Sequence, residues 1–301
     1  MQKIIDISHY QKVTSWAQIA KNVDAVILKA TQGRGLTSNA YLFTDSKFHE
    51  FAKAAIANRI PLGAYHFFTG STEADAVKEA DYFCEVLAPY RDKLMFAVCD
   101  AENYGNRWLL GLSRSQFTAN INAFCARVES HGITAVNYTN VDHINSYINA
   151  RDIPYPCWCA SYGSRKPTVP GGNLIAWQYT SEGRVPGISN NVDMNHGYFS
   201  DAVFAIYRLQ AAGVINTPKY WYEHHSDVRY LDEFLIKAAD KVKGIRDAED
   251  VVPYKVGTLS FEAALGRLEA AGVVNTPEYW RANADKVKYL PELICKLGGA
   301  V

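Results

Sequence analysis

Short apolar runs alternate with longer amphipathic segments over the first 200 residues, and this alternation limits the possible folds more than any other feature. A short apolar run bounded by turn residues is typical of a buried strand, and a longer amphipathic segment is typical of a helix. Their alternation favours a parallel sheet with helices outside it. The expected strands are 3–8, 24–30, 60–68, 94–100, 134–138, 155–160 and 173–179, and the clearest helices are 45–58, 72–87 and 113–131.

Seven or eight such strand–helix units within this length predict a compact α/β domain over residues 1–199. We expect a (β/α) barrel, TIM-like, with some of its helices reduced. An open doubly wound sheet is the alternative for the same pattern. No G-x-G-x-x-G turn follows the first expected strand, which disfavours a dinucleotide-binding version of that sheet.

The last 100 residues contain an internal duplication. Residues 211–221 read AAGVINTPKYW and residues 270–280 read AAGVVNTPEYW, so nine of eleven positions are identical at an offset of 59. The offset holds without gaps from 202–242 to 261–301, and residues 243–258 form the connector. A repeat of this kind indicates two copies of one small structural unit. The sequence therefore predicts a separate all-α domain over residues 200–301.

Each copy contains residues typical of the starts and ends of three short helices. A glycine ends the first helix in a left-handed cap, a threonine caps the second, and a proline occupies its first position. The third begins near a tyrosine. These residues are Gly213, Thr217, Pro218 and Tyr230 in the first copy and Gly272, Thr276, Pro277 and Tyr289 in the second. At least one ring of Tyr220–Trp221 and of Tyr279–Trp280 is expected to build the core.

Charge and hydropathy exclude several partners. The chain has 31 basic and 31 acidic side chains, which gives no support for a nucleic-acid or anionic-membrane partner. No apolar run approaches the roughly 18 residues needed to span a bilayer. The first residues, MQKIIDISHYQ, contain no apolar signal core, so we expect synthesis in the cytoplasm without a signal peptide. The six cysteines lack redox or zinc-knuckle spacing and are expected to be reduced.

Two carboxylates end the expected strand at 94–100. Asp100 and Glu102 are separated by one residue, and alternate side chains of a strand share a face. The carboxyl end of a barrel strand is where catalytic residues of this fold lie. Hydrolysis of a glycosidic bond needs two carboxyl groups, one as the acid and one beside the developing cation. A solvated strand end with acidic residues is the alternative interpretation.

Two further acids strengthen the first interpretation. Asp6 lies within an apolar strand, where a charge is normally excluded, and Asp193 follows the last expected strand and its glycine-containing loop. Either could be an ordinary turn or cap residue. Acids at the ends of strands one, four and eight of a closed barrel would nevertheless converge.

Several motifs together identify a family. IIDISHYQ, DAVILKATQG, PLGAYHFF, VCDAEN, NYTN, WCASYG and IAWQYTSEGRVPGISNNVDMN follow one another in this order. Over about residues 1–199 the chain thereby resembles the family 25 glycoside hydrolases, lysozyme-type muramidases common in bacteriophage endolysins. The resemblance implies a β/α barrel that hydrolyses the β-1,4 bond between N-acetylmuramic acid and N-acetylglucosamine of peptidoglycan. It implies no metal and no other cofactor.

The matching positions also imply roles. Glu102 would be the general acid and base, and Asp100 would stabilise the cationic or oxazoline-like intermediate. Asp6 and Asp193 would complete the carboxylate cluster. Aromatic positions that line the groove are matched by Tyr65, Tyr138 and Trp177. The resemblance suggests retention with the substrate's acetamido oxygen as nucleophile, while direct attack by Asp100 is the other retaining route.

One departure from the family pattern is visible. The motif of the second strand often ends in an acidic residue before its glycine, whereas this chain has Gln32. A glutamine keeps the hydrogen bond and loses the charge, which affects substrate preference rather than the core chemistry.

The duplicated domain has two candidate roles. Two small modules could bind a repetitive wall polymer together, or their apolar faces could mediate self-association. The leading hypothesis is an endolysin with a muramidase barrel and a wall-binding tail, acting on the cell wall after release. The rival is a non-catalytic wall-binding or self-associating protein on a barrel scaffold, which would be expected to have lost Asp100 or Glu102.

Overall fold

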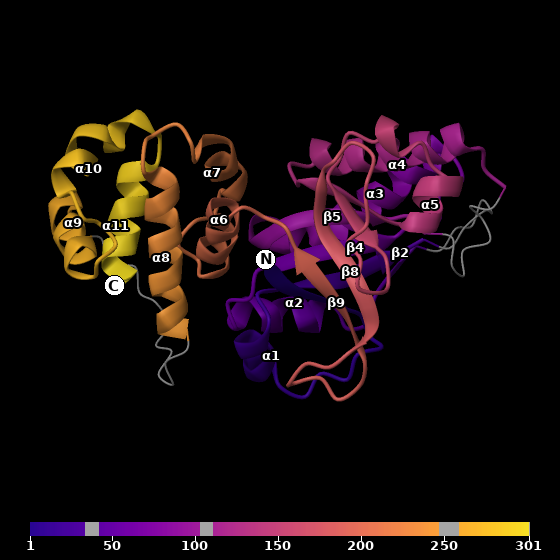
Figure 1. Ribbon diagram of the computed structural model, residues 1–301, viewed down its shortest axis with the longest axis horizontal. Coiled ribbons are helices and arrows are strands. Elements are labelled where there is room, and N and C mark those ends of the chain that lie inside the picture. The colour runs from indigo at the N-terminus through magenta and orange to yellow at the C-terminus, as the bar shows by residue number, and fades with distance from the viewer. Residues whose placement is uncertain (34–41, 103–110, 247–258, 301) are drawn as a thin grey trace. The chain divides into compact units, whose positions relative to one another are not determined.

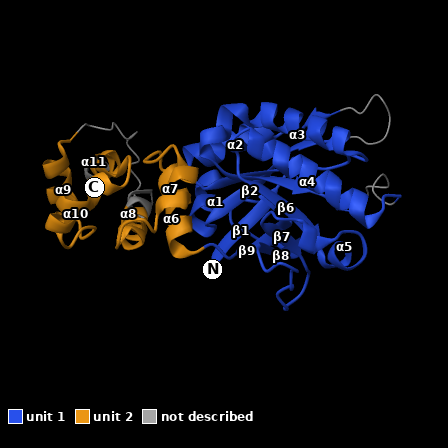
Figure 2. Cartoon of the chain, turned by 90° about the horizontal axis from the view of Figure 1, so that it is seen from above, with its two compact units in different colours: residues 1–199 blue, residues 200–301 orange. Residues whose placement is uncertain are grey.

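The computed structural model describes residues 1–33, 42–102, 111–246 and 259–300, and it divides into two compact units. Unit 1 comprises residues 1–199 and unit 2 residues 200–301 (Figure 2). Most of the connector expected at 243–258 lies outside the described residues. No helix in the described part of the chain is long and apolar enough to cross a membrane.

Unit 1 is a closed barrel of eight strands with a short ninth strand at its side (Figure 1). The sheet runs β1-β9-β8-β7-β6-β5-β4-β2-β3, and pairing of β1 with β2 closes it. The strands are β1 (Gln2–Ile7), β2 (Ala25–Gln32), β3 (Phe43–Thr44), β4 (Leu62–Phe67), β5 (Leu94–Asp100), β6 (Ala135–Asn140), β7 (Cys157–Ala160), β8 (Leu174–Gly183) and β9 (Val192–Gly197). The predicted (β/α) barrel is therefore confirmed.

Helices cover only part of the barrel. Those of unit 1 are α1 (Trp16–Asn22), α2 (Phe48–Ala57), α3 (Glu73–Leu87), α4 (Arg114–Ser130) and α5 (Val141–Ser146), with 3-10 turns η1 (Ala88–Lys93) and η2 (Ala150–Asp152). Helices α2, α3 and α4 pack on β2, β4, β5 and β6. No helix lies between β7 and β8 or between β8 and β9. This is the predicted reduction.

Two strands were not predicted from the sequence. The short β3 pairs antiparallel with β2, and β9 pairs antiparallel with both β1 and β8. Asp193 therefore lies in a strand rather than in a loop after the last strand. Because β9 runs against its neighbours, its beginning lies at the edge where the parallel strands end. Asp193 consequently reaches the same end of the barrel as the other acids.

Local sequence explains the elements that carry the site. All seven residues of β5 are buried, which suits a strand covered on both faces. Helix α3 begins after Thr72, whose hydroxyl accepts from the Asp75 amide, and α4 begins after Ser113, whose hydroxyl accepts from the Gln116 amide. Each cap satisfies one of the free amides at a helix start. The outward side chains of the strands and the inward side chains of the helices form one apolar core.

Unit 2 consists of two three-helix modules. They contain α6 (Asp201–Ala211), α7 (Pro218–His224) and α8 (Leu231–Arg246), then α9 (Phe261–Ala270), α10 (Pro277–Asn283), the 3-10 turn η3 (Ala284–Lys286) and α11 (Leu290–Ala300). Gly213 and Gly272 follow the first helices with φ of 76° and 74°, which confirms the predicted left-handed caps. Thr217 and Thr276 precede the second helices but make no side-chain cap bond, so that part of the prediction is wrong.

Both modules contribute to a single apolar core. Trp221 and Trp280 are 2% and 4% exposed, whereas Tyr220 and Tyr279 only flank that core. One ring of each aromatic pair is thus a core residue, as expected. All six cysteines of the chain are free, and all but Cys295 are buried.

Candidate active site

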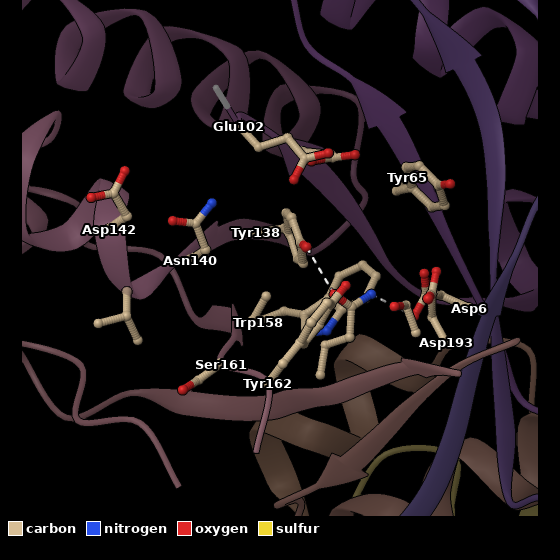
Figure 3. Close-up of a pocket in the computed structure, with 15 residues that line it drawn as sticks. Asp6, Tyr65, Glu102, Tyr138, Asn140, Asp142, Trp158, Ser161, Tyr162 and Asp193 are labelled. Atoms are coloured by element: carbon tan, nitrogen blue, oxygen red, sulfur yellow. Dashed lines mark hydrogen bonds between the residues drawn. The ribbon is translucent and has the colours of Figure 1, made fainter. Parts of the chain in front are cut away.

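A cavity of about 740 Å³ opens at the end of the barrel where the parallel strands terminate. Its walls include all four acids that the sequence singled out: Asp6 on β1, Asp100 on β5, Glu102 just after β5, and Asp193 on β9. Figure 3 shows Glu102 on one side of the cavity, facing Asp6 and Asp193, which lie side by side. Asp142 also lines the cavity, and the sequence analysis did not single it out.

Asp6 and Asp193 form a carboxyl pair across neighbouring strands, because they are register partners in the β1–β9 ladder. Burial raises the pKa of Asp6 well above its usual range, and the charge of Asp193 raises it further. Burial also raises the pKa of Asp193, while a hydrogen bond with Asp6 acts in the opposite direction. Burial and their closeness therefore disfavour simultaneous ionisation of the two carboxyls.

Two buried amides orient the Asp6 carboxyl. Its Oδ2 accepts from Gln178 Nε2 at 3.0 Å and from Asn195 Nδ2 at 2.8 Å. The amide oxygens are held in turn: Gln178 Oε1 accepts from the Tyr138 hydroxyl at 3.0 Å, and Asn195 Oδ1 accepts from the Trp158 indole at 2.7 Å. Each amide can then point only its nitrogen at Asp6. The aromatic walls thereby set the geometry of the acid cluster.

Asp100 and Glu102 face the same cavity from β5 and the residues after it. Asp100 is 6% exposed, and its Oδ1 has no hydrogen-bond partner among the described residues. Burial raises the pKa of Asp100 well above its usual range, the charge of Glu102 adds to the effect, and Lys29 opposes it. Burial raises the pKa of Glu102 from its usual 4.5 to about 7, with a contribution from Asp193. Glu102 is thus partly protonated near neutral pH.

Strand alternation is not what brings this pair together, because β5 ends at Asp100 and Glu102 lies beyond it. The structure places both carboxyls in the cavity without continuing the strand.

Lys29 supplies positive charge beside the acids, and the sequence analysis did not single it out. Its ammonium donates to Gln32 Oε1 at 2.6 Å, also within β2. Burial lowers the pKa of Lys29, whereas Asp100, Asp45 and Glu102 raise it. Gln32, which departs from the family pattern, is therefore the partner of this lysine. A neutral partner leaves the lysine charge directed at Asp100 and Glu102.

Aromatic rings form the remaining walls. Tyr65 and Tyr138 line the cavity, as the resemblance implied, together with Trp158. The ring of Trp158 stands edge-on to Tyr138 with centroids 4.5 Å apart and to Tyr65 at 6.3 Å. Tyr162 lies at the rim and is 61% exposed. Flat amphipathic rings of this kind suit the faces of sugar rings.

The expectation for Trp177 is wrong, because it is not among the residues that line the cavity. Its neighbour Gln178 points inward, so Trp177 projects from the opposite face of β8. There its ring contacts Tyr179 and His196, and its indole donates to the Ser161 carbonyl at 2.7 Å. The motif was placed correctly along the chain, but the inward position is one residue further on.

Gln178, Asn195 and Trp158 were also missed by the sequence analysis. Gln178 and Trp158 lie inside the motifs IAWQYT and WCASYG, so a signal was present in their position. Strand alternation divides such a motif into two faces, but it does not say which face is inward. Asn195 lies on β9, a strand that was not predicted.

No group of three or more histidine, cysteine or acidic side chains suited to a metal ion occurs in the described ranges. His66 lies on the far side of β4 from Tyr65, fully buried, with Nε2 2.7 Å from Glu79 and Nδ1 2.6 Å from Thr31. Both ring nitrogens of His66 are therefore held by buried protein side chains.

The arrangement suits acid-assisted cleavage of a polar substrate. A half-protonated carboxyl near neutral pH can give a proton to a leaving oxygen, and anionic carboxylates beside it can stabilise a developing cation. The volume of the cavity is large enough for a sugar-sized ligand, and its walls offer both aromatic faces and hydrogen-bonding groups.

Comparison with known proteins agrees with this chemistry. Residues 5–188 match the family model of the glycosyl hydrolases family 25. Lysozyme M1 of Streptomyces globisporus is 31% identical over 201 residues, which are 64% of this chain and 66% of that protein. The chain thus spans less than two thirds of the length of this relative.

Solved structures share the barrel. The bacterial lysozyme from Streptomyces coelicolor is 29% identical with a TM-score of 0.58, over 70% of this chain and 96% of that one. The CTP1L endolysin is 25% identical with a TM-score of 0.55, over 71% of each chain. The family model covers more than half of the present sequence, including three of the four clustered acids. The chain therefore belongs to the glycosyl hydrolases family 25.

Proposed function

We propose that this protein is a peptidoglycan muramidase that hydrolyses the β-1,4 bond between N-acetylmuramic acid and N-acetylglucosamine, and that it acts as an endolysin in bacterial lysis. The observation that carries the proposal is the acid cluster: Asp6, Asp100, Glu102 and Asp193 line one cavity, and burial raises the pKa of Glu102 to about 7. Family membership supplies the substrate class.

Glu102 is the general acid. It gives its proton to the glycosidic oxygen as the bond from that oxygen to the anomeric carbon breaks, and it becomes a carboxylate. It then takes a proton from the water that completes hydrolysis. A pKa of about 7 suits both halves of this cycle, because the group is neither fully protonated nor fully ionised at neutral pH.

Asp100 positions the substrate's acetamido group. The acetamido oxygen attacks the anomeric carbon as the leaving oxygen departs, which forms an oxazolinium ion and retains configuration after water attack. The buried Asp100 Oδ1, with no hydrogen-bond partner among the described residues, is available to accept from the acetamido N–H. Its negative charge stabilises the cation, and Lys29 favours the ionised form of Asp100.

Asp6 and Asp193 complete the electrostatic environment. The charge held on this pair faces Glu102 across the cavity and raises the pKa of that acid. Tyr65, Tyr138 and Trp158 provide the aromatic walls against which sugar rings pack. In this proposal Trp158, rather than Trp177, is the tryptophan that binds substrate.

Unit 2 is the wall-binding part of the proposed endolysin. Its separate core and its duplication suit a module that holds the enzyme on a repetitive polymer while the barrel cuts. The resemblance of the barrel to an endolysin structure supports the lytic role. The protein would act on the wall after release from the cytoplasm, with peptidoglycan as its partner and no cofactor.

Analysis of reaction products tests the proposed bond. Purified walls digested by the protein should yield fragments whose new reducing ends are N-acetylmuramic acid, identified by borohydride reduction and mass spectrometry. Reducing N-acetylglucosamine would identify a glucosaminidase instead. Released amines would identify cleavage of the peptide stems, and either result would contradict the proposal.

A further inference from the structure

The two copies of unit 2 contact each other through reciprocal tyrosine pairs. Tyr230 of the first copy packs edge-on against Tyr279 of the second, with ring centroids 5.4 Å apart. Tyr220 packs in the same way against Tyr289, at 5.1 Å. Since Tyr220 and Tyr279 are equivalent at the offset of 59, and Tyr230 and Tyr289 likewise, one contact is the other with the copies exchanged. We call these contacts the Tyr230 seam and the Tyr289 seam.

Each seam exposes one strained tyrosine. Tyr230 and Tyr289 have φ of 69° and 71°, a left-handed conformation that disfavours a bulky side chain. Both lie immediately before a helix and are 47% and 41% exposed. Asparagine or glycine would satisfy the same backbone with less strain. Besides its edge-on contact with the other copy, each ring leaves part of its surface exposed, and strained residues of this kind occur at ligand-binding sites.

The tyrosines are the same in both copies, although a segment before them is not. Residues 222–227 differ from residues 281–286 at every position. Val228 and Leu231, which are buried, are the same as Val287 and Leu290 in the second copy, as core packing requires. Tyr230 and Tyr289 are shared as well, and their rings join the copies at the seams while remaining partly exposed.

A cation accompanies each exposed ring. The guanidinium of Arg229 lies over Tyr230 at 4.7 Å, and the ammonium of Lys288 lies over Tyr289 at 4.9 Å. Both residues are exposed. At the Tyr230 seam the Tyr279 hydroxyl also donates to the Arg229 carbonyl at 2.7 Å, which ties the two copies together beside the cation. Each seam thus presents a flat ring and a positive charge side by side.

The seams differ in their surrounding charge. Near Tyr279, Asn283 donates to the Tyr279 carbonyl at 2.7 Å and accepts from Lys286 at 2.6 Å. At the equivalent place near Tyr220, His224 lies 2.6 Å from Asp227. The Tyr230 seam therefore has Lys286 where the Tyr289 seam has Asp227. Beside the paired tyrosines the difference is reversed, with Glu278 next to Tyr279 and Lys219 next to Tyr220.

We propose that the two seams are equivalent binding sites for peptidoglycan strands, each stacking a sugar ring on its exposed tyrosine and pairing a carboxylate of the muramyl peptide with its cation. The inference rests on the proposed wall-targeting role of unit 2 and deepens it. Peptidoglycan repeats along its length, so two sites on one unit can bind one polymer together and gain affinity by avidity. The positive charges complement the carboxylates that this polymer carries.

Binding to insoluble walls tests the seams. The full chain is used with Glu102→Gln so that the walls stay intact, and the free protein is measured after sedimentation. Tyr230→Asn with Tyr289→Asn should weaken binding by at least about tenfold, because both stacking faces and the avidity are lost. The Tm should not fall, because asparagine accepts the left-handed backbone more readily. Tyr222→Asn is the matched control, since this tyrosine is 54% exposed, lies outside both seams and is replaced by Arg281 in the second copy. Its binding should be unchanged.

A second pair of variants addresses the charge. Arg229→Ala and Lys288→Ala should each weaken binding, and both should reduce the salt dependence of binding. Walls whose carboxylates are amidated with carbodiimide should no longer bind the parent chain. Walls stripped of phosphate-linked polymers by hydrofluoric acid should bind it as before, and loss of binding after stripping would overturn peptidoglycan as the ligand.

The outcomes separate the two proposals. If the parent chain ignores walls from every candidate host, the wall-targeting role itself is wrong. If the parent binds while the double tyrosine variant binds equally well, only the seams are wrong. The double tyrosine variant could also lose binding because it is less stable, which a lowered Tm would reveal. If in that case the Arg229→Ala and Lys288→Ala double variant still binds walls fully, the seams are not the binding sites.

Discussion

The two units differ in what they bury. Among the described residues, seventeen polar or charged side chains are buried, and all but Gln210 belong to unit 1. They include Asp6, Asp100 and the His66–Glu79 pair. The core of unit 2, by contrast, consists of apolar side chains from both of its copies. Unit 1 therefore buries ionisable side chains, whereas unit 2 keeps its charged side chains at the surface.

This difference agrees with the role that we propose for each unit. Burial of a carboxyl is unfavourable unless hydrogen bonds compensate for it, yet burial is also what raises the pKa of Glu102 into a useful range. A catalytic site needs such a low-dielectric environment. Recognition of a wall polymer needs only exposed rings and charges on a stable support, which an apolar helical core provides. The comparison leads to four predictions.

The largest effect should come from the acid itself. Glu102→Gln should lower turnover on soluble muropeptide oligomers by at least about 10²-fold, the range for a lost general acid. Wall binding by unit 2 should stay unchanged, because no residue of that unit is altered. Rates and sedimentation binding are measured on the same preparation, with Glu182→Gln, an exposed acid of the same unit, as the control. Near-normal hydrolysis by a folded Glu102→Gln protein would contradict the assignment.

Removal of unit 2 should have the next largest effect, and only on insoluble substrate. A fragment of residues 1–199 has its own core and all four acids, so it should hydrolyse soluble oligomers at close to the full rate. On intact walls it should be at least about tenfold slower, because the tail supplies local concentration. Turbidity loss of wall suspensions is compared with oligomer hydrolysis. Equal losses on both substrates would mean that the units are not separable.

The pH should affect the two units differently. Glu102 must be protonated to act as the acid, so turnover should fall as pH rises and reach about half near its pKa of about 7. The same raised pKa stabilises the folded state below the usual value of 4.5, and this contribution is lost as pH rises through about 7.

Unit 2 has no buried carboxyl among its described residues. Its binding to walls should therefore change less than turnover over this pH range. Rate profiles and thermal melts of the full chain, the Glu102→Gln variant and the 200–301 fragment test this contrast. If turnover stays high at pH values far above 7, Glu102 is not the general acid.

The smallest expected effect is that of a chelator. No metal-like cluster of side chains occurs in the described part of either unit, so millimolar chelator should leave both hydrolysis and wall binding unchanged. Activity assays with and without chelator, followed by addition of zinc, provide the check. Loss of activity that zinc restores would require a metal site.

The units also differ in how far their sequences predict them. In unit 2 the helix boundaries follow from local chemistry, because glycine at positive φ and proline at a first helical position act within one turn of the chain. The contacts between copies did not follow. Tyr230 and Tyr279 are 49 residues apart in the sequence and meet only because the two modules pack on each other.

In unit 1 the acids, the order of strands and the barrel followed from the sequence, because apolar runs and motif order survive in the chain itself. Strand β9 did not, since Val192 and Met194 are its only apolar side chains, too few to indicate a buried strand, and its direction depends on the neighbours with which it pairs. The error at Trp177 has the same origin: the sequence predicted that Trp177 lines the cavity, whereas Gln178 and Trp158 do. A motif records which residues occur together, whereas only closure of the barrel decides which face of β8 is inside.

The sequence by itself determined the family, the two units and the identity of the acids, since these depend on residue type and order. Tertiary structure alone decided that Asp6 meets Asp193, that the charge of Lys29 acts on Asp100, and that burial raises the pKa of Glu102. These properties depend on distance and on exclusion of water between segments far apart in the chain. Neither quantity exists until the sheet has closed into a barrel.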